Sequence, residues 1–485
     1  MLSLTLYNCT GLRPCISGFQ NSNRHERNAA IMVRSRDTRA VTAEQSPPPP
    51  PGSPGTHWRR PSFQHSRKRR KIASSETETR IRSQTLKPSL NRALSSCTRN
   101  HTNSHVRWPD TNRWESRRTL RKRDWTSSAR DLSKYNDRVV IVSYNLLGVE
   151  NATKHPQLYR GVSPEYLDWE YRKKLLCKEL RGYQPSILCF QEVDHFDDLN
   201  KILQKDGFRG LHKARSGESR DGCAIFWKSD LFTLLHEENI EFQRFGLRNN
   251  VAQFCILKMN QGLHSDDATS RSLRATTSRS IVVGTTHVLY NPKRGDIKLG
   301  QMRLFLEKAY ELSQEWGCIP VIITGDLNSL PQSALYEFVA SSKLHIQQHD
   351  RRQISGQMFS SEYRGSRHLY NRITRWTNEE KRLATGSIGN SLKHPLMLRS
   401  AYAGVPGSSK VRDKTGEPLA TSYHSLFSGC VDYIWHTLDL IPVKVLEGLP
   451  TPILKKTGGL PSKEWGSDHL AVACEFAFAN ESDQA

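Results

Sequence analysis

The chain has 485 residues, of which 36% are hydrophobic. No stretch approaches the roughly 18 to 20 consecutive apolar residues of a membrane-spanning helix, so the sequence argues against a transmembrane protein. Ten cysteines without a Cys-x-x-Cys pair argue against a disulfide scaffold and a structural zinc site. Five cysteines lie inside apolar runs, which predicts buried thiols in a reducing compartment: Cys189, Cys223, Cys255, Cys430 and Cys474.

The net charge of +23 is distributed unevenly. Residues 1–135 contain 27 Lys and Arg against 9 Asp and Glu, whereas the remaining residues contain 44 against 39. Low hydrophobicity with high net charge buries too little surface to offset chain entropy, so we predict a disordered, basic, Pro/Ser/Arg-rich region over 1–135. A folded catalytic domain is then expected over 136–485.

Two basic clusters lie in this predicted tail. The run Arg67 to Lys71 is typical of a nuclear-import signal, of an RNA-binding arm, or of a solvated charge run. The cluster Arg117 to Arg123 lies among tryptophans, a combination that suits single-stranded nucleic acid. The first 23 residues lack acidic side chains, as organellar transit peptides do. The sequence favours the nucleus and cytoplasm, with organellar targeting as the alternative.

From Asp137 onward, short β-branched runs alternate with helical patterns. Four runs predict buried strands: Val139–Val142, Ile187–Phe190, Ile281–Val283 and Val321–Ile323. One helix is predicted from Leu167 to Leu180, where Gly182 and Pro185 follow as stop signals, and another from about Leu299 to Gln314. Loop-like insertions are expected over Asn260–Arg279 and much of Arg351–Pro418. The alternation indicates a layered α/β domain.

A polar motif follows each of these apolar runs, and two more polar motifs lie near the C-terminus. The six motifs are Ser143-Tyr144-Asn145, Gln191-Glu192, Thr285-Thr286-His287, Gly325-Asp326-Leu327-Asn328, Val431-Asp432-Tyr433-Ile434 and Ser467-Asp468-His469. Strand ends that carry such side chains build one polar cleft. Carboxylates such as Glu192 suit Mg²⁺, which polarises phosphoryl oxygens, and no Ser or Cys nucleophile is evident. The chemistry predicted is metal-assisted hydrolysis of a phosphate ester by water.

Each motif alone has an ordinary structural explanation. A single Glu after a strand is usually a surface residue, Gly-Asp-x-Asn is usually a turn, and one histidine is usually a satisfied core residue. Ser-Asp-His is as typical of a cap. Only the order and spacing of all six motifs favour a catalytic site.

In this order the motifs resemble the endonuclease/exonuclease/phosphatase superfamily over about residues 137–480. Four segments are similar to plant homologues of carbon catabolite repressor protein 4: Ser143–Leu147, Cys189–Val193, Gly325–Ser329 and Val431–Trp435. The segment Thr286–Leu299 is similar to the Angel branch. The resemblance implies an α/β fold in which helices flank two packed β-sheets, preceded by the disordered basic tail.

The resemblance also implies roles for ten residues. The catalytic residues would be Asp326, Asn328, His469, Asp432, His287 and Asn145; the metal ligands Glu192 and Asp468; and the base-stacking residues Pro292 and Phe427. Asp326 would orient or deprotonate the attacking water, and Asp432 would fix the tautomer of His469. His287 would donate to the phosphate, and Asn328 would hold the phosphate or the nucleoside. Asn145 would support the metal ion and the phosphate, and the Pro–Phe pair would clamp an adenine.

The function implied is a Mg²⁺-dependent 3′→5′ exoribonuclease that removes mRNA poly(A) tails and releases 5′-AMP. Hydrolysis of 2′,3′-cyclic phosphates at RNA ends, as the Angel-like segment suggests, and a non-catalytic RNA-binding scaffold are the alternatives. The scaffold is disfavoured because the catalytic residues are all present. The family's large CCR4-NOT deadenylation complex is a possible partner, although its deadenylase docks through leucine-rich repeats, which are not found in this sequence.

Overall fold

The computed structural model describes residues 123–135, 137–260, 279–358 and 375–479. The predicted tail up to residue 122, with both basic clusters except Arg123, lies outside the described residues. So does most of the insertion predicted over Asn260–Arg279.

Two large mixed sheets form the centre of the described part of the chain. The seven-stranded sheet has the order β1 (Trp125–Ser127), β16 (Leu440–Leu446), β17 (Val472–Phe478), β2 (Arg138–Asn145), β3 (Ile187–Gln191), β5 (Gly222–Lys228), β4 (Phe208–Ala214). The six-stranded sheet has the order β12 (Arg399–Ser400), β15 (Asp432–His436), β9 (Val321–Asp326), β8 (Ser280–His287), β7 (Val251–Met259), β6 (Phe232–Glu241). Two hairpins are β10 (Lys343–His345) with β11 (Ser391–Lys393), and β13 (Ser422–His424) with β14 (Phe427–Gly429).

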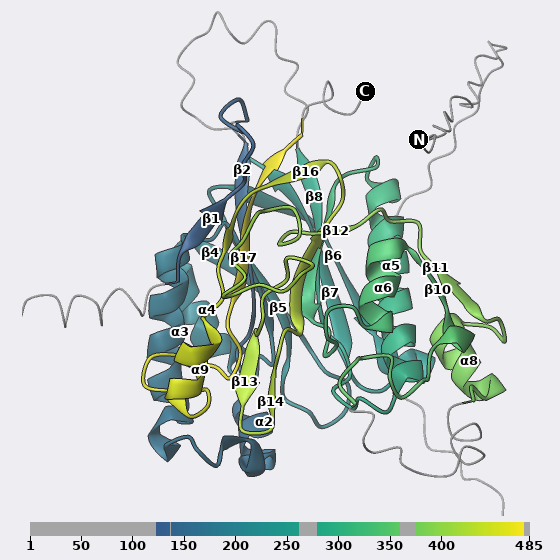
Figure 1. Cartoon of the computed structure of the whole chain (residues 1–485). Coiled ribbons are helices and arrows are strands. Elements are labelled where there is room, and N and C mark those ends of the chain that lie inside the picture. The colour runs from purple at the N-terminus through teal and green to yellow at the C-terminus, as the bar shows by residue number, and fades with distance from the viewer. Residues whose placement is uncertain (1–122, 136, 261–278, 359–374, 480–485) are drawn as a thin grey trace, which may run out of the picture. The chain divides into compact units, whose positions relative to one another are not determined.

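The described part of the chain contains seven α-helices. They are α2 (Val149–Lys154), α3 (Trp169–Tyr183), α4 (Phe196–Lys205), α5 (Gly295–Glu315), α6 (Ala334–Ser341), α8 (Asn378–Thr385) and α9 (Thr451–Thr457). Figure 1 shows the two sheets side by side, with α3 and α4 on one outer side and α5 and α6 on the other. Among the described residues, no helix has the length and apolar character needed to cross a membrane.

Three apolar layers hold this sandwich together. Between the sheets, Ile141 and Cys189 of one sheet pack with Val283 and Ile322 of the other. Because successive strand residues point to opposite faces, Val142 and Leu188 instead join the layer under α3 and α4. The third layer lies between the six-stranded sheet and α5 and α6. The expected α/β fold of two packed sheets with flanking helices is confirmed.

The predicted elements are present, with differences at their ends. All four predicted strands occur, and α3 ends at Tyr183, next to the predicted stop signals. Helix α5 begins at Gly295, one turn before the predicted start, because its first two turns are buried on all sides and show no amphipathic period. The segment predicted as loop-like over Arg351–Pro418 contains α8, which begins with a capping box at Thr377 and Glu380. That prediction is therefore wrong in part.

The domain boundary predicted at residue 136 also needs correction. Residues Trp125–Ser127 pair with β16, and Leu132 and Tyr135 pack against Val443 and Ala477. Arg123 is buried, donates to the Glu447 carbonyl at 2.9 Å and lies 3.7 Å from the Glu179 carboxylate. The folded part thus includes residues 123–135. Their apolar segments are short and lie in a basic stretch, so charge composition alone assigned them to the tail.

The prediction that the five thiols in apolar runs are buried is confirmed. All five named thiols are buried and free, and no disulfide joins the described cysteines.

We predict that residues 123–135 contribute several kcal/mol to folding. The described part of the chain begins at residue 123, so chains that start at residue 123 and at residue 136 make a matched pair. Removal of Arg123 leaves the buried Glu179 carboxylate without its cation, which typically costs about 3–5 kcal/mol. Thermal unfolding followed by circular dichroism should show a clearly lower midpoint for the shorter chain. Equal midpoints would contradict the corrected boundary.

A second stability effect arises at Glu417, which is 1% exposed. Burial raises the pKa of its carboxyl group to about 7, and hydrogen bonds from Ser400 and Tyr336 oppose this shift only in part. A carboxyl whose folded-state pKa lies above its unfolded value stabilises the fold below the unfolded pKa. This contribution is lost as the pH rises through the folded-state pKa.

We therefore predict that Glu417→Gln reduces the loss of stability between pH 4.5 and pH 8. The wild-type free energy of unfolding should fall by about 3 kcal/mol more than that of the variant over this range. Urea unfolding at several pH values measures the difference, and Tyr336 can still donate its 2.8 Å hydrogen bond to the amide oxygen. Parallel pH profiles would refute the assignment.

Candidate active site

The catalytic side chains converge because strand ends of both sheets meet at one edge. In the parallel pair β2–β3, Asn145 lies opposite Gln191, which directly precedes Glu192. In the other sheet, Asp326 of β9 lies between His287 of β8 and Asp432 of β15. The expected cleft at the strand ends is therefore built by register.

The side-chain amide of Asn145 joins the two sheets. Its Nδ2 donates to Glu192 Oε1 at 3.0 Å and to Asp326 Oδ2 at 3.1 Å. Its Oδ1 accepts from the Leu147 amide at 3.0 Å, which fixes the orientation of the side chain. One fully buried amide thus sets the distance between the carboxylates of opposite sheets.

Glu192 is prepared as an anionic ligand. It follows β3 with φ of 56°, a left-handed conformation that is costly for Glu. Its Oε2 accepts from the Gly148 amide at 3.0 Å and from Asn151 Nδ2 at 2.8 Å. Burial raises the pKa of Glu192, but His287, which is protonated at low pH, and the amides of Asn151 and Asn145 outweigh it and hold the pKa at about 2. The carboxylate is ionised at neutral pH.

The two histidines hold different charges. Burial lowers the pKa of His469, but the Asp432 carboxylate, which lies 2.8 Å from His469 Nδ1, raises it well above 6.5. His287 is different, because burial and Arg215 lower its pKa although Asp326 opposes this shift. At neutral pH the site therefore combines an imidazolium with a neutral imidazole, a pairing typical of acid–base sites.

The structure brings both histidines to the same carboxylate. His287 Nε2 lies 3.5 Å, and His469 Nε2 3.8 Å, from Asp326 Oδ2. Asn328 Nδ2 lies 2.9 Å from His287 Nε2, and the Asn328 amide donates to Asp326 Oδ1 at 2.8 Å. All six residues predicted as catalytic thus form one buried cluster.

The carboxylate oxygens of the cluster fit a hard divalent cation, because such cations prefer oxygen ligands. Asp468 Oδ2 accepts from Tyr159 at 3.0 Å, whereas its buried Oδ1 has no hydrogen-bond partner in the described residues. Burial raises the pKa of Asp468 to about 6, with a further contribution from the Glu192 charge, although His469 opposes this shift. A second group, with ligand atoms within 4.8 Å of one another, is Asp326, Asp432 and His469. Because His469 is engaged by Asp432, the carboxylates are the better cation ligands.

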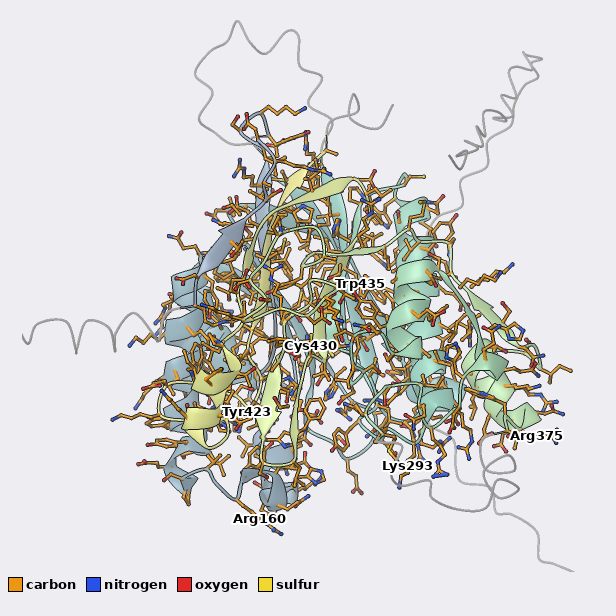
Figure 2. The ribbon with its side chains drawn as sticks, viewed as in Figure 1. Arg160, Lys293, Arg375, Tyr423, Cys430 and Trp435 are labelled. Carbon is orange, nitrogen blue, oxygen red and sulfur yellow. The ribbon has the colours of Figure 1, made fainter. Side chains whose placement is uncertain are left out.

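The predicted base-stacking residues lie on two different loops. Pro292 is in the loop between β8 and α5, and Phe427 begins β14; both are partly exposed. Hairpin β13–β14 is tied to the site, because the Tyr423 amide donates to the Asp468 carbonyl at 2.9 Å. Figure 2 shows Tyr423 on this hairpin, close to α9. Phe427 is thus held beside the Asp468–His469 segment, and its pairing with Pro292 across an adenine stays a prediction.

Sequence reasoning missed residues that organise the cluster from a distance. Arg215 Nη2 lies 3.2 Å from His287 Nδ1, and its Nε pairs with Asp221 at 3.0 Å. The fully buried Arg172 donates to the Leu146 carbonyl at 2.7 Å, next to Asn145. These contacts span large sequence separations, and neither arginine lies in a polar motif that follows a strand.

Lys298 is the most informative of these residues. Its side chain is fully buried in α5, and Nζ donates to the Asn328 carbonyl at 2.8 Å. Burial lowers its pKa to about 7, although Asp326 opposes this shift. Asn328 has φ of 45°, so the lysine fixes a strained residue at the end of β9. Sequence alone favours a solvent-exposed helical lysine at this position.

We predict that Lys298→Met reduces kcat for a phosphodiester about 10- to 100-fold, because small displacements of positioned groups have large effects. The free energy of unfolding should change little, since an apolar side chain of similar volume replaces a buried charge. Steady-state kinetics and urea unfolding measure the two effects. The control is Lys308→Met on the same helix, where the lysine pairs with Glu311 at 2.7 Å near the surface. Unchanged kcat would contradict the positioning role.

Comparisons with known proteins agree with this geometry. The Endonuclease/Exonuclease/phosphatase family matches residues 142–469. The chain is 56% identical to carbon catabolite repressor protein 4 homolog 5 of Arabidopsis thaliana, over 74% of this chain and 82% of that protein. Homolog 3 of the same plant is 46% identical, over 73% and 79%.

Among solved structures, the crystal structure of ANGEL2, a 2′,3′-cyclic phosphatase, in complex with adenosine-2′,3′-vanadate, is similar with a TM-score of 0.60 and 30% identity. The similarity covers 74% of this chain and 99% of that structure. The chain therefore belongs to the endonuclease/exonuclease/phosphatase family of hydrolases and, within it, to the carbon catabolite repressor protein 4 homologues.

Proposed function

We propose that this hydrolase is a Mg²⁺-dependent 3′→5′ exoribonuclease that shortens poly(A) tails of mRNA and releases 5′-AMP. The observation that carries the proposal is the Asp432–His469 pair, which lies against Asp326 and beside the hairpin that carries Phe427. A stacking side chain fixed next to a phosphoester site suits a nucleotide substrate better than a lipid or inositol phosphate.

The reaction follows from the groups in the cluster. Asp326 accepts a proton from a water molecule, whose oxygen attacks the 3′-terminal phosphodiester. The bond from phosphorus to the 3′-oxygen of the preceding nucleotide breaks, and that oxygen leaves as a hydroxyl after it takes up a proton from the solvent. The His469 imidazolium offsets the charge that develops on the phosphoryl oxygens. Neutral His287 and the Asn328 amide orient the same group.

A divalent ion held by Glu192 and Asp468 would supply Lewis-acid polarisation of a phosphoryl oxygen. Mg²⁺ is the ion proposed, because the donors are hard oxygens. In the cell we propose action in mRNA turnover in the nucleus and cytoplasm, with the poly(A) tail as the nucleic-acid partner.

A second candidate is hydrolysis of 2′,3′-cyclic phosphates at RNA ends. It is favoured by the similarity to ANGEL2, which is described as a 2′,3′-cyclic phosphatase. The two activities need the same metal ion and histidines, so only the end of the substrate RNA separates them.

We predict that the full chain with Mg²⁺ shortens an RNA that ends in an A-tract faster than a matched RNA that ends in a U-tract. Glu192→Gln should reduce the rate at least about 100-fold, because it weakens the anionic metal site. The control is Glu311→Gln, at an exposed position of α5. Gel electrophoresis resolves the products.

Two outcomes would oppose the proposal. Removal of a 2′,3′-cyclic phosphate with the chain length intact would favour the second candidate. Equal rates on A-tract and U-tract RNA would remove the adenine preference while leaving a nuclease.

A further inference from the structure

A large polar hollow lies near the catalytic cluster. Its volume is about 1150 Å³, and its walls come from α2, the segment 216–220 and the segment 243–249. This volume is at the upper end of typical small-molecule sites, which are roughly 300–1,000 Å³. None of the predicted site residues lines it.

Two chains of contacts connect this hollow to the phosphate site. The Gly148 amide donates to Glu192 Oε2, and the next residue, Val149, lines the hollow. Arg215 lies 3.2 Å from His287, and the next residue, Ser216, lines it as well. The hollow therefore lies near Glu192 and His287, although neither side chain lines it.

The walls suit a ribose and its phosphate rather than a stacked base. Phe, Tyr and Trp are missing from the residues that line the hollow, which are polar or charged apart from glycines and one valine. The Ser216 hydroxyl is buried and makes no hydrogen bond in the described part of the chain. Asn249 holds Ser219 at 3.0 Å, and Arg248 is exposed at the rim.

Arg160, Lys293 and Arg375 lie along the same lower end of the view as α2 (Figures 1 and 2). Helix α2 also forms one wall of the hollow. Cations on such a surface attract nucleic acid by counterion release, independent of sequence.

We propose that this hollow binds the nucleotide immediately 5′ of the scissile phosphate, with Ser216 and Asn249 contacting its 2′-hydroxyl and ribose, and Arg248 its phosphate. The inference rests on the proposed function, because the RNA upstream of the terminal adenosine has to continue from the phosphate site over a neighbouring surface. The site then recognises RNA by a hydroxyl group and accepts any base there.

Equilibrium binding tests the proposal without depending on turnover. The full chain carrying Glu192→Gln would be titrated with an A-tract RNA, with the same RNA carrying one 2′-deoxy sugar at the penultimate nucleotide, and with one carrying it six nucleotides upstream. Loss of one hydrogen bond corresponds to about a 5- to 10-fold weaker Kd for the penultimate substitution alone. Equal Kd values for the three RNAs would overturn the proposal.

Variants identify the residues involved. Ser216→Ala should weaken the unmodified RNA about 5-fold and remove most of the discrimination against the penultimate 2′-deoxy sugar. Arg248→Ala should weaken all three RNAs and reduce the salt dependence, whereas the control Arg244→Ala, which is exposed and paired with Glu241 at 3.0 Å, should change neither. If Ser216→Ala and Asn249→Ala both still bind the penultimate 2′-deoxy RNA more weakly than the unmodified RNA, this hollow is not the site that recognises the hydroxyl.

The exonuclease proposal and the proposal of a nucleotide site in the hollow can be rejected independently. Turnover by the wild-type chain on the unmodified A-tract RNA tests the exonuclease alone. If the wild type removes only a terminal cyclic phosphate, the same penultimate substitution on that RNA still tests the hollow. Discrimination there would support the nucleotide site although poly(A) shortening had failed, and its absence would reject the site as well.

Discussion

The active site depends on one amide that lies between two sheets. Asn145 Nδ2 has two hydrogens, and it donates one to Glu192 and the other to Asp326, which belong to different sheets. Both carboxylates are buried, and two like charges in a medium of low dielectric repel strongly unless polar donors separate them. The Asn145 amide therefore allows the two charged carboxylates to lie close together where the sheets meet. A divalent cation would add to the same compensation on the solvent side.

The second consequence of burial is the different charge of the two histidines. Asp432 holds the proton on His469, whereas His287 lies against Arg215 and the Asn328 amide, which are N–H donors and disfavour an imidazolium. The protonation state of each histidine is therefore set by its neighbours, since both side chains are the same imidazole. A phosphate that enters the cluster meets a cation on one side and a neutral ring on the other. This asymmetry gives the site a direction, with Phe427 on the His469 side and the polar hollow on the His287 side.

Local sequence patterns predicted a layered α/β domain and the convergence of the catalytic residues, whereas the two-sheet sandwich followed from the resemblance to the family. Period-two and apolar runs define the strands, and a polar residue after each run places Asn145, Glu192, His287 and Asp326 at one edge. Arg215 and Lys298 could not be found this way, since their partners lie 72 and 30 residues away along the chain. The start of the fold was missed for a compositional reason: a basic stretch conceals the edge strand at Trp125.

Backbone strain shows how the fold and the chemistry are coupled. Glu192 and Asn328 have φ values of 56° and 45°, and such conformations cost about 1–3 kcal/mol each. The chain around each residue is held on both sides: Leu146 donates to Gln191 and Val193 to Gly222, while Leu327 donates to Val431 and Lys298 holds the Asn328 carbonyl. These hydrogen bonds hold Glu192 and Asn328 in strained backbone conformations that a flexible loop would not keep. Because the strain is opposed by contacts from both sheets, a loosened sandwich would lose the site before it lost the fold.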